Sequence, residues 1–270
     1  MALIAMKKGK EILSKFPTMP SIRYKSDPLS GSEIFTEADI EINEAIIDHI
    51  HKSYPSDSII GEERSLADKI QTDRFWLVDP IDGTRSFIES RYGSSIMLSY
   101  IAGGKPIFGA IYDISKDRHV LSLMNAGTFI IRDEKPEPIE MHRPPQKVLA
   151  CNPYGDAKLK EALIKALNLA DVTEVESSGL RAFEIAQGNA SLMVSLPGSA
   201  KIWDTAPGFV MLNEIGGCYT DINGKILEYS LDKKTHKDGA IASFGIDHEK
   251  ATALVKNFIA RDVRPSDTKV

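Results

Sequence analysis

The stretch FWLVDPIDGTRSF, residues 75–87, joins an apolar run to two aspartates that stand three positions apart. The apolar run predicts a β-strand that ends at Asp79 and Asp82. Pro80 stiffens the turn between them and has no N–H, so the two carboxylates are able to converge on one point. Two anions held together need a cation. Mg²⁺ is indicated because hard cations take oxygen ligands, and the Ile81 carbonyl is a further oxygen at this turn.

Gly83 and Thr84 follow at once and predict the start of a helix. The free N–H groups of a helix N-terminus attract anions, so a metal ion beside them makes an arrangement suited to phosphate. The pattern alone has a simpler interpretation, in which Asp79 and Asp82 are turn formers and Thr84 is an N-cap.

Composition sets the broad class of the protein. The chain has 270 residues with 42% hydrophobic content, enough for one large domain or two moderate lobes. A net charge of −5 argues against a nucleic-acid partner and against a membrane-surface partner, since both usually need a basic face. We therefore expect a globular protein that acts on small molecules.

Two further features favour the cytoplasm. The N-terminal stretch MALIAMKKGKEILSKF (residues 1–16) predicts an amphipathic helix rather than an export signal, and no segment has the roughly 18 to 20 apolar residues of a membrane span. Cys151 and Cys218 lie far apart in the sequence without metal-ligand spacing. We expect both cysteines to be reduced and buried.

The order of patterns predicts two lobes. Residues 37–54 predict a helix and residues 95–133 an antiparallel meander, which gives an N-terminal α+β lobe over residues 1–140. Proline and charge concentrate in residues 132–146, the predicted boundary. Beyond it we expect an α/β lobe over residues 147–260 and a polar, disordered tail over residues 261–270. The helices predicted in the second lobe cover residues 157–167, 180–188, 205–215 and 247–259.

Several pieces of the chain, taken together, resemble the inositol monophosphatase superfamily. They are FTEAD ending at Asp39, IIGEE at 59–63, WLVDPIDGTRSF at 76–87 and IWDTAPGFVMLNEIGG at 202–217, in the order and spacing of that family. The resemblance implies a five-layer αβαβα sandwich with the site between two lobes. It also implies a metal-dependent, lithium-sensitive phosphomonoesterase that forms a homodimer.

The resemblance assigns metal ligands residue by residue. Glu62, Asp79 and the Ile81 carbonyl resemble the ligands of a first Mg²⁺ ion. Asp79, Asp82 and Asp204 resemble those of a second, with Asp79 bridging the two. A weaker third ion uses Glu62 with water in this family, so the resemblance implies two or three Mg²⁺ ions per site.

The resemblance also implies catalytic and substrate contacts. Thr84 and Asp39 are the pair that activates the attacking water, near Glu62. Metal ions about 3.5 to 4 Å apart would clamp the attacking and leaving oxygens of the displacement. The residues expected to contact the substrate are Asp82, Gly83, Thr84, Arg181 and Asp204.

The substrate is less sharply indicated. Inositol-specific members carry a glutamate about seven residues before the aspartate of the Trp-Asp pair, where this chain has Leu196 or Pro197 in SLPGSAKIWD. Arg181 stands where those enzymes have a small residue. A guanidinium there is able to bind a second phosphate or a carboxylate, and the alternative is an arginine on the solvent face of a helix.

We therefore expect hydrolysis of a small phosphorylated metabolite, such as an inositol, sugar or nucleotide phosphate. The alternative is a 3'(2'),5'-bisphosphate nucleotidase, which the GTRSFI continuation and the basic residue at 181 also fit. A histidinol-phosphate phosphatase shares that continuation but usually lacks the tryptophan found here at 203. A non-catalytic regulatory protein is the remaining alternative, and it would be free to lose ligands that this chain keeps.

Overall fold

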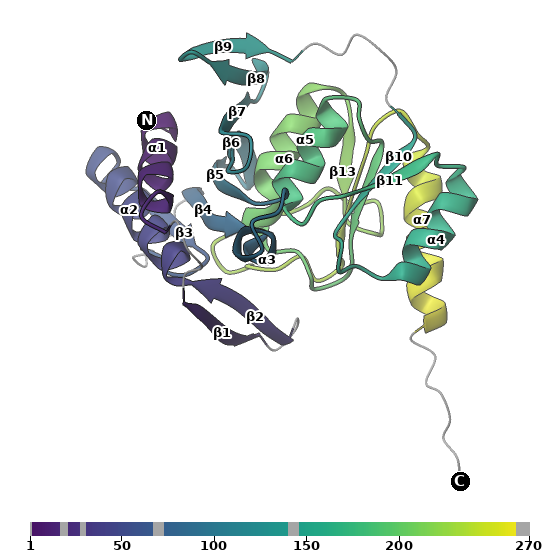
Figure 1. Cartoon of the computed structure of the whole chain (residues 1–270). Helices are drawn as coiled ribbons and strands as arrows, with labels where there is room; N and C mark the ends of the chain where they lie inside the picture. The colour runs from purple at the N-terminus through teal and green to yellow at the C-terminus, as the bar shows by residue number, and fades with distance from the viewer. Residues whose placement is uncertain (1, 17–20, 28–30, 67–72, 140–145, 263–270) are drawn as a thin grey trace.

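The computed structural model describes residues 2–16, 21–27, 31–66, 73–139 and 146–262. Two large β-sheets stand side by side, with pairs of helices outside and between them, and a separate two-stranded sheet is formed by β1 and β2 (Figure 1). No helix in these ranges is both long and apolar enough to cross a bilayer.

The larger sheet contains the quoted stretch. Its seven strands lie in the order β3-β4-β5-β6-β7-β8-β9, and only the β3–β4 pair is parallel. Short turns connect each strand from β5 to β8 with the next, as expected for a meander of alternating apolar runs. The strands are β3 (Ser58–Gly61), β4 (Arg74–Asp82), β5 (Ser95–Ala102), β6 (Lys105–Asp113), β7 (Arg118–Leu123), β8 (Gly127–Arg132) and β9 (Lys135–Pro138).

The smaller sheet has five strands in the order β11-β10-β12-β14-β13. β10 is parallel to both β11 and β12, whereas β14 is antiparallel to β12 and β13. The carboxyl ends of the parallel strands β10, β11 and β12 therefore share one edge of the sheet, which is where ligands bind in sheets of this kind. The strands are β10 (Val148–Cys151), β11 (Asp171–Glu174), β12 (Leu192–Ser195), β13 (Cys218–Thr220) and β14 (Ala240–Ser243).

The helices complete five layers, and the predicted αβαβα sandwich is confirmed. α1 and α2 cover the outer face of the larger sheet, α5 and α6 lie between the sheets, and α4 and α7 cover the outer face of the smaller sheet (Figure 1). α3 is a single short turn after β4. The helices are α1 (Ala2–Leu13), α2 (Glu37–Ser53), α3 (Thr84–Ile88), α4 (Ala157–Leu167), α5 (Ser178–Ala186), α6 (Ile202–Glu214) and α7 (His248–Asp262).

Apolar side chains bury the faces between these layers. The isoleucines at 42, 46 and 50 follow helical spacing on α2 and are fully buried against the larger sheet. α6 is apolar on nearly all sides because it contacts both sheets. Its position fixes Asp204 between the half of the molecule that contains the larger sheet and the half that contains the smaller sheet.

Some predictions about elements were wrong. A hairpin of β1 (Ile22–Asp27) and β2 (Gly31–Thr36) was not predicted from the sequence. α6 begins at Ile202 rather than 205, and α7 continues to Asp262, beyond the predicted start of the tail at 261. Residues 263–270 lie outside the described residues. Both cysteines are free, but Cys218 is exposed, because it lies on the edge strand β13.

β9 lies inside the stretch 132–146, which concentrates proline and charge, and it pairs with β8 as part of the larger sheet. The prolines of β9 are tolerated because this strand is at the edge of the sheet. The division of the chain into two lobes stays a prediction.

Candidate active site

A bulge at the end of β4 sets the direction of the two aspartates. Asp79 pairs with Met97 and Asp82 with Ser95, so β4 carries one extra residue between these pairs. The bulge includes Pro80, which cannot donate to a ladder, and it turns the chain toward the smaller sheet. β4 thus delivers two carboxylates to the same edge of the sheet.

A cavity of about 540 Å³ opens at this edge. It is lined from both halves of the molecule, and its volume lies in the range of ligand pockets. The predicted site residues that line it are Glu62, Asp79, Ile81, Asp82, Gly83, Thr84, Arg181 and Asp204. The structure therefore brings together residues that lie as far apart as 62 and 204 in the sequence.

The carboxylates in this cavity destabilise one another. Burial, and then the charges of Glu62, Asp82 and Asp204, raise the pKa of Asp79 well above its usual value. Burial and the charges of Asp82 and Glu62 do the same for Asp204. Asp79 Oδ1 is buried and has no hydrogen-bond partner among the described residues. A hard divalent cation fits this donor set, because it satisfies the orphaned oxygen and neutralises the charge.

The carboxylates nevertheless do not converge closely enough to form a preformed metal-ligand cluster. In the described ranges, no three His, Cys, Asp or Glu side chains form a ready metal-ligand cluster. Asp82 Oδ2 instead accepts hydrogen bonds from Ser177 Oγ at 2.7 Å, Ser178 Oγ at 2.9 Å and the Gly179 N–H at 3.2 Å. The N-terminus of α5 therefore fixes Asp82 from the half of the molecule that contains the smaller sheet.

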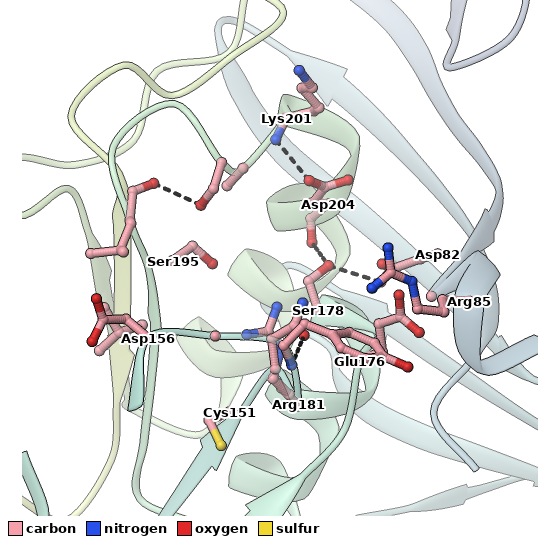
Figure 2. A pocket seen from close by; sticks show the side chains of 18 of the residues that line it. Asp82, Arg85, Cys151, Asp156, Glu176, Ser178, Arg181, Ser195, Lys201 and Asp204 are labelled. Atoms are coloured by element: carbon pink, nitrogen blue, oxygen red, sulfur yellow. Dashed lines mark hydrogen bonds between the residues drawn. The ribbon is translucent and has the colours of Figure 1, made fainter. Parts of the chain in front are cut away.

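Asp204 is held by its own helix. It is the third residue of α6, and its Oδ2 accepts the Lys201 N–H at 2.7 Å. Ser178 Oγ also lies 2.8 Å from the Asp204 carbonyl oxygen, so the single hydroxyl hydrogen of this serine has acceptors on both Asp82 and Asp204 (Figure 2).

Asp39 and Thr84 meet beside the cavity, as predicted for a catalytic pair. Thr84 Oγ1 lies 3.0 Å from the Ile81 carbonyl oxygen and 3.4 Å from Asp39 Oδ1. Asp39 Oδ2 accepts the Thr36 N–H at 2.7 Å and the Thr36 hydroxyl at 2.6 Å. Burial raises the pKa of Asp39 to about 6, although the hydrogen bonds from Thr36 oppose this effect. A carboxylate with this pKa is suited to accept a proton near neutral pH.

The turn into α3 requires glycine. Gly83 is the N-cap of this helix and has φ = +85°, a left-handed conformation. A Cβ atom at this position would lie 2.3 Å from the Gly93 carbonyl oxygen. A side chain would therefore disturb this turn, and Gly83 itself lines the cavity.

Arg181 belongs to the cavity wall. Only 6% of the residue is exposed, so the alternative of a solvent-facing arginine was wrong. Its Nε is buried without a hydrogen-bond partner in the described part of the chain. Leu196, at the position considered for an inositol-binding acid, also lines the cavity.

The sequence did not indicate several other lining residues. Tyr154 and Glu176 follow β10 and β11, and they lie in loops at the shared carboxyl edge of the parallel strands. Arg85 lies over the Tyr154 ring at 4.4 Å, which joins the two halves across the cavity rim. The strand order of the smaller sheet was the signal that could have pointed to these loops.

The chain was also compared with known proteins. Residues 1–260 match the model of the inositol monophosphatase family. The chain is 27% identical over 224 residues to the inositol-1-monophosphatase of Bacillus subtilis, covering 80% of this chain and 82% of that protein. It is 31% identical over 198 residues to the 3'(2'),5'-bisphosphate nucleotidase CysQ of Escherichia coli K12, covering 72% of this chain and 79% of that protein.

Solved structures show the same fold. The Thermotoga maritima IMPase TM1415 superposes with a TM-score of 0.78 at 23% sequence identity. The match covers 96% of this chain and 97% of that one.

Proposed function

The chain belongs to the inositol monophosphatase family, and from this premise we propose that it is a Mg²⁺-dependent phosphomonoesterase acting on a small phosphorylated metabolite. One observation carries the proposal. The buried Asp79, with an orphaned oxygen, lies among carboxylates that raise its pKa and line one cavity. Such a group of anions is stable as carboxylates only with cations bound.

We propose that Glu62, Asp79 and the Ile81 carbonyl hold one Mg²⁺ ion. Asp79, Asp82 and Asp204 would hold a second. When bound, Mg²⁺ supplies positive charge that neutralises the phosphate and activates water. A third, weaker ion at Glu62 follows from the family resemblance alone.

The chain's own groups hold the phosphate and move the proton. The N–H groups of Gly83 and Thr84 begin α3 and donate to phosphate oxygens. Thr84 and Asp39 accept the proton of the attacking water, which the 3.4 Å separation of Thr84 Oγ1 and Asp39 Oδ1 supports. The substrate thus lies between α3 and the loops of the smaller sheet.

The first experiment measures phosphate release with and without Mg²⁺. The substrates are inositol 1-phosphate, 3'-phosphoadenosine 5'-phosphate, fructose 1,6-bisphosphate and histidinol phosphate. We expect Mg²⁺-dependent release from at least one of them, loss of release in Asp79→Asn, and retention in Asp238→Asn, an exposed control outside the cavity. Absence of release from every substrate would favour the regulatory alternative.

A 3'(2'),5'-bisphosphate nucleotidase is the second candidate. The buried Arg181, with its unpartnered Nε, favours this activity because a guanidinium binds a second phosphate bidentately. For 3'-phosphoadenosine 5'-phosphate, Arg181→Lys should lower kcat/KM because it keeps the charge but loses the planar fork. An equal loss for inositol 1-phosphate would contradict this role.

We also propose inhibition by lithium, assembly as a homodimer and a cytoplasmic location. Family resemblance supports the first two, and the two free cysteines are compatible with a reducing compartment. Lithium titration of phosphate release and light scattering test the first two directly.

A further inference from the structure

Glu176 is a carboxylate of the cavity wall for which the proposed chemistry has no use. It follows β11 and lines the cavity beside α3, the short helix that comes directly after β4. Its Oε2 accepts the Ser86 N–H of α3 at 2.6 Å, and the Ser86 hydroxyl also interacts with it. Glu176 thus reaches from one half of the molecule to the other.

Ser86 does not use all of this carboxylate. An ionised carboxylate offers about four acceptor positions, and Ser86 supplies two donors. The residue is only partly buried and lines the cavity, so acceptor capacity remains toward the ligand. Figure 2 shows Glu176 in the centre of this view, near Arg85 and Asp82, whose charges both act on it.

The charge of Glu176 restricts what it is able to contact. A phosphate oxygen at this carboxylate would be repelled, whereas a neutral hydroxyl or an amine would donate to it. Arg181 sets the opposite preference on its part of the wall. The cavity therefore offers both a cation for an anionic group and a carboxylate for a hydrogen-bond donor.

We propose that Glu176 is a specificity-determining residue that accepts a hydrogen bond from a hydroxyl of the leaving alcohol. This inference rests on the proposed phosphatase function and adds to it the residue that recognises the alcohol part of the substrate. Leu196 lines the cavity at the position where an acid was considered and offers no acceptor, whereas Glu176 lines the same cavity and does offer one. A leaving group without a hydroxyl gains nothing from it.

The competing explanation is purely structural, since Glu176 also anchors α3. Glu176→Gln separates the two roles, because the amide oxygen still accepts from Ser86 while the charge is removed. Loss of the anchor alone would slow every substrate equally. Loss of a substrate contact changes the ratio between substrates.

The test measures kcat/KM for inositol 1-phosphate and for cyclohexyl phosphate, which has the same ring size but no hydroxyl. In Glu176→Gln we expect kcat/KM for inositol 1-phosphate, divided by kcat/KM for cyclohexyl phosphate, to fall about tenfold. This is the usual effect of losing a hydrogen bond to a charged group. Cyclohexyl phosphate should be hydrolysed as well as before or better, since a repulsive charge is gone. The control Glu161→Gln changes an exposed carboxylate of α4 outside the cavity and should leave the ratio unchanged.

The results separate this inference from the proposed function. If the unaltered protein hydrolyses both esters and Glu176→Gln slows both equally, Glu176 is only an anchor and the inference is wrong. An unchanged ratio with unchanged rates also refutes it. If the unaltered protein hydrolyses neither these esters nor the other phosphates above, the proposed function itself fails.

Discussion

Replacing Asp39 by asparagine should stabilise the metal-free protein while it removes activity. The side chain is 1% exposed, and burial raises its pKa from 3.8 to about 6. An acid whose pKa is raised in the folded state stabilises the fold only below its unfolded pKa. That stability is lost as the pH rises through 3.8 to about 6.

The size of the effect follows from the pKa difference. At about 1.36 kcal/mol per pKa unit, the ionised Asp39 lowers the free energy of unfolding by about 3 kcal/mol at pH 7.5. At pH 5 the same two pKa values mean that Asp39 lowers the free energy of unfolding by only about 1.6 kcal/mol. Asparagine carries no charge at either pH and keeps an oxygen that accepts from Thr36. The variant should therefore be more stable at pH 7.5, by up to about 3 kcal/mol, with a smaller advantage at pH 5.

Urea unfolding of both proteins at pH 7.5 and pH 5, in the presence of EDTA, measures this difference. Asp48→Asn is the matched control, since Asp48 is an exposed carboxylate on the same helix. Turnover of Asp39→Asn with Mg²⁺ should fall by about 100-fold or more if Asp39 helps to accept the proton. A variant that is less stable than the original at pH 7.5, or whose advantage does not shrink at pH 5, would refute the reasoning.

The remaining predictions concern the cation site and its supports. Asp204→Asn should lower kcat by more than the roughly 10- to 100-fold typical of outer-shell partners, with an unchanged circular dichroism spectrum; an active variant would exclude it as a ligand. Glu62→Gln should raise the Mg²⁺ concentration needed for half-maximal phosphate release, and an unchanged requirement would contradict its role. Gly83→Ala should lower the thermal midpoint and the turnover together, because its Cβ would lie 2.3 Å from the Gly93 carbonyl oxygen. Gly109→Ala, whose Cβ would lie 2.7 Å from Pro207 Cα, should cost about 1 to 3 kcal/mol in urea unfolding.

Sequence patterns predicted the part of the site whose residues are close together in the sequence. The residues from Asp79 to Thr84 are neighbours in the chain, so the change from strand to helix placed them correctly at one edge of the sheet. Glu62 and Asp204 were placed by family resemblance, because no local rule brings together a residue that follows β3 and a residue of α6. The structure confirms that they line the same cavity, and their roles as ligands stay predictions.

Features that depend on tertiary packing could not be predicted. Ser177 is the N-cap of α5 and Ser178 is its first residue, and both also contact Asp82 in the other half of the molecule. Glu176 and Tyr154 reach the cavity because the order of strands in the smaller sheet brings their loops to it. Cys218 is exposed for the same kind of reason, since its burial depends on which strand forms the sheet edge.

The central claim is that the carboxylates around Asp79 bind Mg²⁺ and that this binding permits phosphate ester hydrolysis. The most direct measurement is phosphate release as a function of Mg²⁺ concentration, for the unaltered protein and for Asp79→Asn, with the best substrate found above. The account predicts release that rises from zero and saturates with Mg²⁺ in the unaltered protein, and no release in Asp79→Asn at any Mg²⁺ concentration. Release that does not depend on Mg²⁺, or equal release by both proteins, would contradict it.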